Sequence, residues 1–188
     1  PWNRVRKFFL RRMINQAKFG VVPFESEDIW LCATCRNCVQ RCPRGVEIID
    51  VMRAMRRLLV PDGVVPASIP NLRSVMTNFA SVGNPWGQEP KDRANWAKGL
   101  GVKEFGEDTE LLYFPCCYPS YDPRLKKVAQ ATVNILNKAG VDFGILGPKE
   151  NCCGESVRKA GNEVLFKRLA RENIKAFVEN GVKKILVS

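Results

Sequence analysis

The sequence predicts a mixed fold, in which a small helical module precedes a parallel α/β sheet. Three observations support it. Four cysteines crowd a short loop between two helical segments. From Glu110 onward, short apolar runs alternate with segments of helical periodicity, the pattern of a doubly wound parallel sheet. The 188 residues are 45% hydrophobic and 26% charged, which excludes a disordered or fibrous chain.

The first part, residues 1–62, is expected to be helical. Residues 2–18 have apolar side chains at helical spacing and only basic charges, so this helix suits an anionic lipid surface, an acidic partner or packing on its own module. Its apolar face consists of Val5, Phe8, Phe9 and Met13. Ser26 is the expected N-cap of a turn before the cysteine loop. A second helix is predicted over 46–59, with a stop at Pro61.

Residues 63–108 are rich in Pro, Gly and Asn, and we expect a mostly irregular connecting arm with a short helix near 91–98. Residues 109–188 form the predicted α/β domain. The strands are expected at 111–114, 141–146 and 184–187, and the helices at 123–139 and 162–180. The side chains expected to face inward are Val128, Thr132, Ile135 and Leu136 on the first helix and Val164, Leu165, Leu169, Ile174 and Phe177 on the second.

Composition excludes several classes of function. Thirty Lys and Arg against nineteen Asp and Glu give a net charge of +11, and there is no histidine. Ser-His-Asp catalysis, Cys-His catalysis and His-ligated metals are therefore excluded within this chain. No apolar run approaches the ~20 residues that span a bilayer, and no secretory signal is visible. The charge permits nucleic-acid binding, but basic residues are spread over both halves, and we expect no such partner.

The first group of cysteines lies between the predicted helices. It reads C-x2-C-x2-C-x3-C-P and consists of Cys32, Cys35, Cys38 and Cys42, before Pro43. Bacterial-type ferredoxins hold [4Fe–4S] clusters with this run, and its last thiolate can serve a second cluster. A structural zinc site instead pairs C-x2-C with a distant second pair. The spacing therefore predicts one cubane or two, with Cys42 closing its own cluster or serving another.

The other cysteines form two vicinal pairs, Cys116 with Cys117 and Cys152 with Cys153. A disulfide between neighbouring residues is strained, and the chain shows no sign of secretion, so metal ligands or redox thiols are expected instead. Each pair follows a predicted strand. Because the carboxyl ends of parallel strands meet at one edge of a sheet, both pairs are predicted to project there.

Two stretches around these pairs are recognisable. They read Tyr113-Phe114-Pro115-Cys116-Cys117 and Asn151-Cys152-Cys153-Gly154-Glu155. They resemble the first part of a cysteine-rich CCG domain. This domain follows a ferredoxin-like module that includes Arg41-Cys42-Pro43-Arg44-Gly45-Val46-Glu47-Ile48. The layout is similar to the D subunit of heterodisulfide reductase and to the related iron–sulfur subunit of the membrane complex that serves dissimilatory sulfite reductase. The stretch Gly83-Asn84-Pro85-Trp86-Gly87 is also similar to that family's inter-domain segment.

The resemblance implies a noncubane [4Fe–4S] cluster at which a disulfide is reduced in two one-electron steps. Its ligands, and the residues of this cluster-based catalysis, would be Cys117, Cys152 and Cys153. The family usually has glycine where this chain has Cys116, which is then an extra cofactor ligand, a redox-active thiol or a small buried filler. The family's remaining ligands would fall beyond both ends of this sequence, so we expect a longer chain.

The leading hypothesis is an iron–sulfur oxidoreductase subunit. Electrons would pass from the cubane to the CCG site, which would reduce a disulfide or a protein-bound sulfur substrate. Quinone-linked or cytochrome subunits would be its partners, and they would associate it with the cytoplasmic side of a membrane. The alternative is an electron relay of a lactate or glycerol-3-phosphate dehydrogenase, which also resembles this layout and performs no disulfide chemistry.

Overall fold

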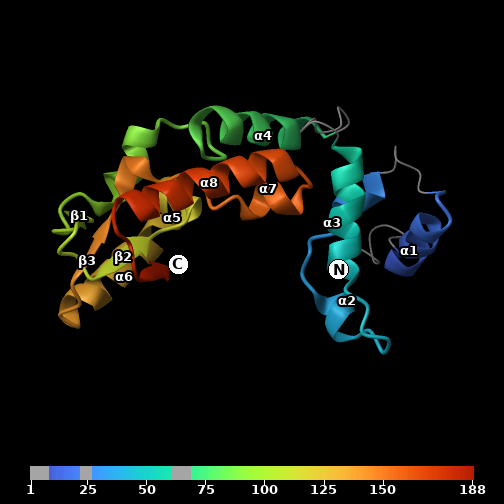
Figure 1. The fold of residues 1–188 in the computed structure, drawn as a ribbon, viewed down its shortest axis with the longest axis horizontal. Coiled ribbons are helices and arrows are strands. Elements are labelled where there is room, and N and C mark those ends of the chain that lie inside the picture. Colours follow the sequence, from blue (N-terminus) through green and yellow to red (C-terminus); the bar gives the residue numbers. More distant parts are fainter. Residues whose placement is uncertain (1–8, 22–26, 61–68) are drawn as a thin grey trace. The chain divides into compact units, whose positions relative to one another are not determined.

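The computed structural model describes residues 9–21, 27–60 and 69–188 (Figure 1). The chain divides into two compact units, one formed by residues 1–73 with 155–166 and the other by residues 74–154 with 167–188. The described part of the first unit is helical and contains the first cysteine loop, and the second unit contains a parallel sheet. The expected combination of a helical part and an α/β part is confirmed.

The segments around the first cysteine loop share one apolar core. The elements of the helical unit are α1 (Leu10–Lys18), η2 (Glu27–Leu31), α2 (Asn37–Gln40), α3 (Ile48–Leu59), α7 (Glu155–Lys159) and the first residues of α4 (Pro70–Val82) and α8 (Glu163–Glu179). The core consists of Met13, Ile29, Cys32, Ile49, Met52 and Met55. The helix predicted over 46–59 is confirmed as α3. Of the helix predicted over 2–18, the described part is α1; Val5 and Phe8 lie outside the described residues, as do Ser26 and Pro61.

The second unit is built on a four-stranded sheet in the order β1-β3-β2-β4, with every neighbouring pair parallel. Its strands are β1 (Lys103–Glu104), β2 (Leu111–Phe114), β3 (Phe143–Ile145) and β4 (Ile185–Val187). Its helical segments, apart from α4 and α8, are η4 (Pro90–Ala97), α5 (Cys117–Tyr121), α6 (Lys126–Lys138) and η5 (Gly147–Lys149). The three strands and two long helices predicted for this part are therefore confirmed.

Helices cover both faces of this sheet. On one face, Tyr113 of β2 packs with Trp96 of η4 and Val133 of α6. On the other, Leu112 and Phe114 of the same strand form a cluster against which α8 packs. Successive strand residues point to opposite faces, so both faces of β2 are apolar. This burial on both sides explains the continuous apolar run in its sequence.

The predicted inward faces of two helices were partly wrong. Four side chains expected inside are exposed: Val128, Ile135, Val164 and Ile174. The buried apolar positions are Ala129 and Val133 on α6 and Leu165 and Leu169 on α8. On α6, Ala129 and Val133 lie four residues apart on the face that packs with Trp96 of η4 and Tyr113 of β2, so the position of the neighbouring elements decides which apolar residues are buried.

The arm expected to be mostly irregular also contains regular elements. It includes the helix α4 and the edge strand β1, and its expected short helix is the 3₁₀ helix η4. The strand β1 has two charged residues and no apolar alternation, so periodicity could not reveal it. No described helix is both long and apolar enough to cross a membrane.

Gly144 in β3 allows β1 to approach. Lys103 pairs with Gly144 across the two strands, and a Cβ atom on Gly144 would lie 2.8 Å from the backbone N and Cα of Phe105. Backbone atoms cannot move aside without opening the pairing of β1 with β3. The glycine is therefore required by space rather than by backbone conformation.

We expect Gly144→Ala to lower the free energy of unfolding by about 1–3 kcal/mol, because it overpacks the β1–β3 contact. Urea denaturation followed by circular dichroism measures the effect. Gly106→Ala is the matched control, since a Cβ atom there meets nothing within 4 Å. Equal stabilities of the two variants would contradict this account of β1.

Candidate iron–sulfur sites

The first cysteine loop runs from the end of η2 into α2. Cys32 is buried, Cys38 and Cys42 are half-buried, and Cys35 is exposed. Thr34 and Arg36 have left-handed backbone conformations, with φ of +53° and +63°. Residues with side chains adopt this region at a cost of about 1–3 kcal/mol. Contacts around the loop must therefore hold it in shape.

Arg56 of α3 supplies such contacts. Its guanidinium is buried and donates hydrogen bonds to the carbonyl oxygen of Ile29 from Nε (3.1 Å) and Nη2 (2.8 Å), and from Nη2 to that of Cys32 (2.7 Å). Nη1 donates to the carbonyl of Lys159 (2.8 Å). Burial lowers the pKa of this guanidinium, and the negative charge of Cys32 opposes that effect. One buried cation thus fixes the backbone at Cys32, the first cysteine of the loop.

The thiols of this loop influence one another. Burial raises the pKa of Cys38, and the nearby charges of Cys32 and Cys35 raise it further. The backbone N–H groups of Val46 and Arg44 lower the pKa of Cys42. A thiolate held by amide N–H groups is the form that binds iron.

A pocket of about 620 Å³ opens beside Cys38 and Cys42. Three arginines line it: Arg11, Arg41 and Arg44. Positive charge favours thiolates over thiols. The all-sulfur donor set, the amide donors and these cations together fit an anionic iron–sulfur group.

The structure also brings the two vicinal pairs together. Cys116 and Cys117 follow β2, and Cys152 and Cys153 follow η5, which itself follows β3. The four thiols form a closed ring of contacts, in which Cys116 meets Cys117 and Cys153, and Cys152 meets the same two residues. Cys117 and Cys152 are buried, Cys116 is half-buried and Cys153 is exposed. One side of this ring therefore faces the protein and the other faces solvent.

Contacts within the ring shift the pKa values of its thiols in opposite directions. Hydrogen bonds from Cys117 and Cys153 lower the pKa of Cys116. The hydrogen bond that Cys117 donates to Cys116 raises the pKa of Cys117, and those made with Cys117 and Cys153 raise the pKa of Cys152. Among the described residues, no three thiol or carboxylate side chains converge as they would on a single metal ion. The donor set is again all sulfur, as an iron–sulfur group requires.

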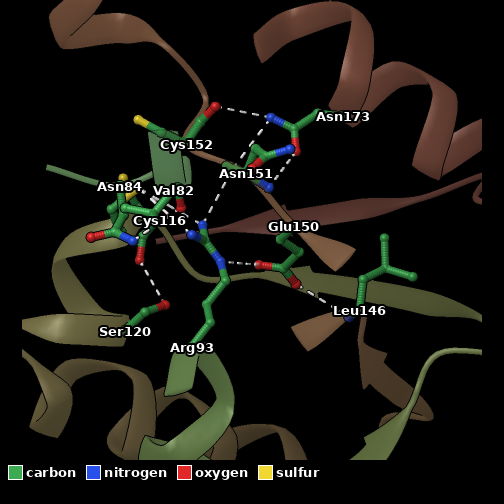
Figure 2. Close-up of polar contacts among 11 residues, drawn as sticks. Val82, Asn84, Arg93, Cys116, Ser120, Leu146, Glu150, Asn151, Cys152 and Asn173 are labelled. Atoms are coloured by element: carbon green, nitrogen blue, oxygen red, sulfur yellow. Dashed lines mark hydrogen bonds and ion pairs between the residues drawn. The ribbon is translucent and has the colours of Figure 1, made fainter. Parts of the chain in front are cut away.

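A buried arginine, Arg93, contacts one thiol of the ring, and Figure 2 shows it with Glu150, Asn151 and Cys152. Arg93 of η4 is 2% exposed, and its Nη1 and Nη2 lie 3.9 and 3.8 Å from Sγ of Cys117. Nε forms an ion pair with Oε2 of Glu150 at 3.2 Å, and Nη2 donates to the carbonyl of Asn151 at 3.2 Å. Burial opposes the charge of Arg93, but Cys117 and Glu150 outweigh it and raise the pKa of the guanidinium. Burial also raises the pKa of Glu150 to about 7, although Arg93 opposes this shift.

Asn173 of α8 holds the loop that carries the second pair (Figure 2). Its Oδ1 accepts from the N–H of Asn151 (2.9 Å), and its Nδ2 donates to the carbonyls of Asn151 (3.3 Å) and Cys152 (3.0 Å). On the other side, the N–H of Cys152 donates to the carbonyl of Gly83 (2.9 Å). Gly83 has a φ of +68°, and a Cβ atom there would overlap Oδ1 of Asn151. Gly83 therefore supports the ring from a segment distant in sequence.

Residues 111–188 match the family model of the cysteine-rich domain named CCG. This segment is a CCG domain. Both vicinal pairs, the sheet strands β2, β3 and β4 and the helix α8 lie within it. Arg93 and Gly83, which contact the cysteine-bearing segments, precede it.

Most of the chain is similar to several oxidoreductases. It is 42% identical over 170 residues to the EtfAB:quinone oxidoreductase of Syntrophomonas wolfei. The aligned segment covers 86% of this chain and 23% of that protein. It is 41% identical over 182 residues to the probable iron-sulfur-binding oxidoreductase FadF of Bacillus subtilis, and this alignment covers 92% of the chain and 25% of FadF. It is 32% identical over 163 residues to the D subunit of the dihydromethanophenazine:CoB–CoM heterodisulfide reductase of Methanosarcina mazei. This alignment covers 85% of the chain and 38% of the D subunit. No solved structure matches the chain significantly.

The resemblance to the D subunit of heterodisulfide reductase and to the CCG domain is therefore confirmed, and the chain is homologous to iron–sulfur-binding oxidoreductases. It spans about a quarter of the length of the first two relatives and 38% of the third. Sequence reasoning missed four residues of these sites: Arg56, Arg93, Glu150 and Asn173. Burial of a charged or amide side chain would have revealed them, and a single sequence does not show burial.

Replacing Arg56 tests its support of the first loop. Arg56→Met removes this donor from the buried carbonyls of Ile29 and Cys32 and from the carbonyl of Lys159, so we expect the free energy of unfolding to fall by about 2–4 kcal/mol. Arg57→Met is the control on the next residue, because it removes only a partly exposed ion pair with Glu163, worth about 0–1 kcal/mol. Urea denaturation compares the two variants, and equal losses would contradict the role of Arg56.

Proposed function

We propose that this chain is the iron–sulfur part of an electron-transferring oxidoreductase with two cluster sites. Cys32, Cys35, Cys38 and Cys42 would hold one cluster, a [4Fe–4S] cubane. In the CCG domain, Cys117, Cys152 and Cys153 would be ligands of the other, with Cys116 beside them. The observation that carries this proposal is the convergence of two vicinal cysteine pairs, from separate strand ends, into one ring of thiols.

Bound iron–sulfur groups would supply one-electron redox chemistry at both sites. The chain's own residues would do the rest. Amide N–H groups and arginines would stabilise thiolates at the first site, while Arg93 and Asn173 would fix the segments that carry the CCG thiols. The burial of Cys117 and Cys152 would limit access of water, and the exposed Cys153 would face an incoming substrate or partner.

The electron acceptor that we propose is quinone-linked. Two of the relatives, at 42% and 41% identity, are named an EtfAB:quinone oxidoreductase and a probable iron-sulfur-binding oxidoreductase. By analogy, a flavoprotein would donate electrons to this chain, and further segments or subunits of a membrane-associated complex would pass them to quinone. In this form the CCG site relays electrons and no sulfur bond is broken.

Disulfide reduction is the second candidate. It is favoured by the similarity to a heterodisulfide reductase and by the exposure of Cys153 at the ring. The substrate S–S bond would break, two electrons would arrive from the upstream donor, and two protons from solvent would complete two thiols. A disulfide or a protein-bound sulfur substrate would fit this chemistry. The cluster at the CCG site would then be the noncubane form that the resemblance implies.

Cluster loading tests the two-site proposal. Anaerobically purified protein should contain iron and acid-labile sulfide, and Cys35→Ser and Cys117→Ser should each lower both by one site's share. Electron paramagnetic resonance should show that Cys117→Ser retains the reduced cubane signal and that Cys35→Ser loses it, because the two ligand sets are separate. Zinc without sulfide, or identical spectra of the two variants, would contradict the proposal.

The acceptor can be identified on the same protein. For the relay, we expect a soluble quinone analogue to reoxidise the reduced clusters, and a thiol added to the oxidised protein to produce no new paramagnetic signal. Cys117→Ser is the control that removes the CCG site. A thiol-induced signal that disappears in Cys117→Ser would overturn the relay and establish disulfide chemistry.

A further inference from the structure

We propose that Arg93 is a positioning residue that holds the CCG cysteine segments together and raises the reduction potential of the group they bind. This inference rests on the proposed iron–sulfur group at these thiols. Arg93 lies outside the CCG domain and donates no ligand atom. It acts through Cys117 and through the loop before Cys152.

The guanidinium joins the two cysteine-bearing segments. Both of its terminal nitrogens lie within 3.9 Å of Sγ of Cys117, which begins α5 after β2. The same Nη2 donates to the carbonyl of Asn151, which immediately precedes Cys152. Arg93 therefore contacts a thiol of one segment and the backbone of the other, and Figure 2 shows its dashed contacts with Glu150 and Asn151. The arginine therefore fixes the spacing of the two pairs as well as their charge.

Glu150 orients this cation. Its Oε2 accepts from Nε of Arg93, and its Oε1 accepts from the backbone N–H of Leu146 at 3.2 Å, so the carboxylate is held at both oxygens. The side chains of Arg93 and Glu150 are 2% and 1% exposed. Because Glu150 occupies Nε, the two terminal nitrogens remain directed to Cys117.

Burial makes this charge effective. Exposed lysines and arginines dominate the net charge of +11, but water and salt screen them. A buried cation in van der Waals range of a thiolate acts through a lower effective dielectric constant. It stabilises the reduced state of the bound group, which carries one more negative charge, and thereby raises the reduction potential. The carboxylate of Glu150, farther along the guanidinium, moderates this effect.

The test is the sign of the potential shift in two opposite variants. Arg93→Met removes the cation and should make the CCG-site midpoint potential more negative. Glu150→Gln removes the compensating anion and should make it more positive. Arg93→Lys keeps the charge, so its midpoint should stay nearer to that of the unaltered protein than the midpoint of Arg93→Met does. A redox titration followed by electron paramagnetic resonance, at the same pH for every variant, measures all three.

Lys91→Met is the matched control. Lys91 lies on the same 3₁₀ helix as Arg93 and is exposed, so removing its charge should leave the midpoint unchanged. The cubane signal provides an internal reference, because the partners of Arg93 described above all belong to its own compact unit and the cubane loop belongs to the other. A merely structural role of Arg93 would alter cluster content without producing shifts of opposite sign.

The results distinguish a failure of the role of Arg93 from a failure of the proposed two-site function. If the unaltered protein shows a cubane signal and no CCG-site signal, the two-site function and the role of Arg93 both fail. If the CCG-site signal is present and Arg93→Met and Glu150→Gln shift it in the same direction or not at all, only the role of Arg93 fails. Should Arg93→Met lose its cluster, a positive shift in Glu150→Gln still supports the inference, and an unchanged midpoint overturns it.

Discussion

Contact between a buried guanidinium and a thiol is the interaction on which the CCG site depends. Arg93 would be costly to bury alone, since an unpaired charge loses its hydration. Glu150 and Cys117 compensate for that loss, and the carbonyl of Asn151 takes a further donor. Removing any partner would leave a buried charge uncompensated. The cysteine segments and the η4 helix are therefore mutually dependent.

The first cysteine loop relies on a comparable device with different partners. The hydrogen bonds that Arg56 donates go to backbone carbonyls of the turn before the loop, of Cys32 and of α7. This anchoring helps to explain how Thr34 and Arg36 remain in left-handed conformations. At the first loop, buried Arg56 binds backbone carbonyls. At the CCG site, buried Arg93 binds a backbone carbonyl and also contacts a sulfur atom. Each arrangement places positive charge where thiolates are expected.

Periodicity predicted much of the fold and less of its packing. The strand 111–114 and the helices α3, α6 and α8 were found because their patterns are local and span several residues. The inward faces of α6 and α8 were partly wrong, since exposed Ile135 and Val164 are as apolar as the residues that are buried. The position and shape of the facing surface decide between them, and these are not visible in one segment alone. The two-residue strand β1 gave no pattern at all.

The sequence by itself determined the chemistry of the sites: eight thiols, no histidine, a ferredoxin-type run and two vicinal pairs after strands. Such features are local, because residue type and spacing depend only on neighbouring positions in the sequence. Only the tertiary structure decided which other side chains serve these thiols. Arg93 meets Glu150 across 57 residues, and Asn173 meets Cys152 across 21. Contacts of that range depend on the packing of the whole unit, which brings distant segments to one edge of the sheet.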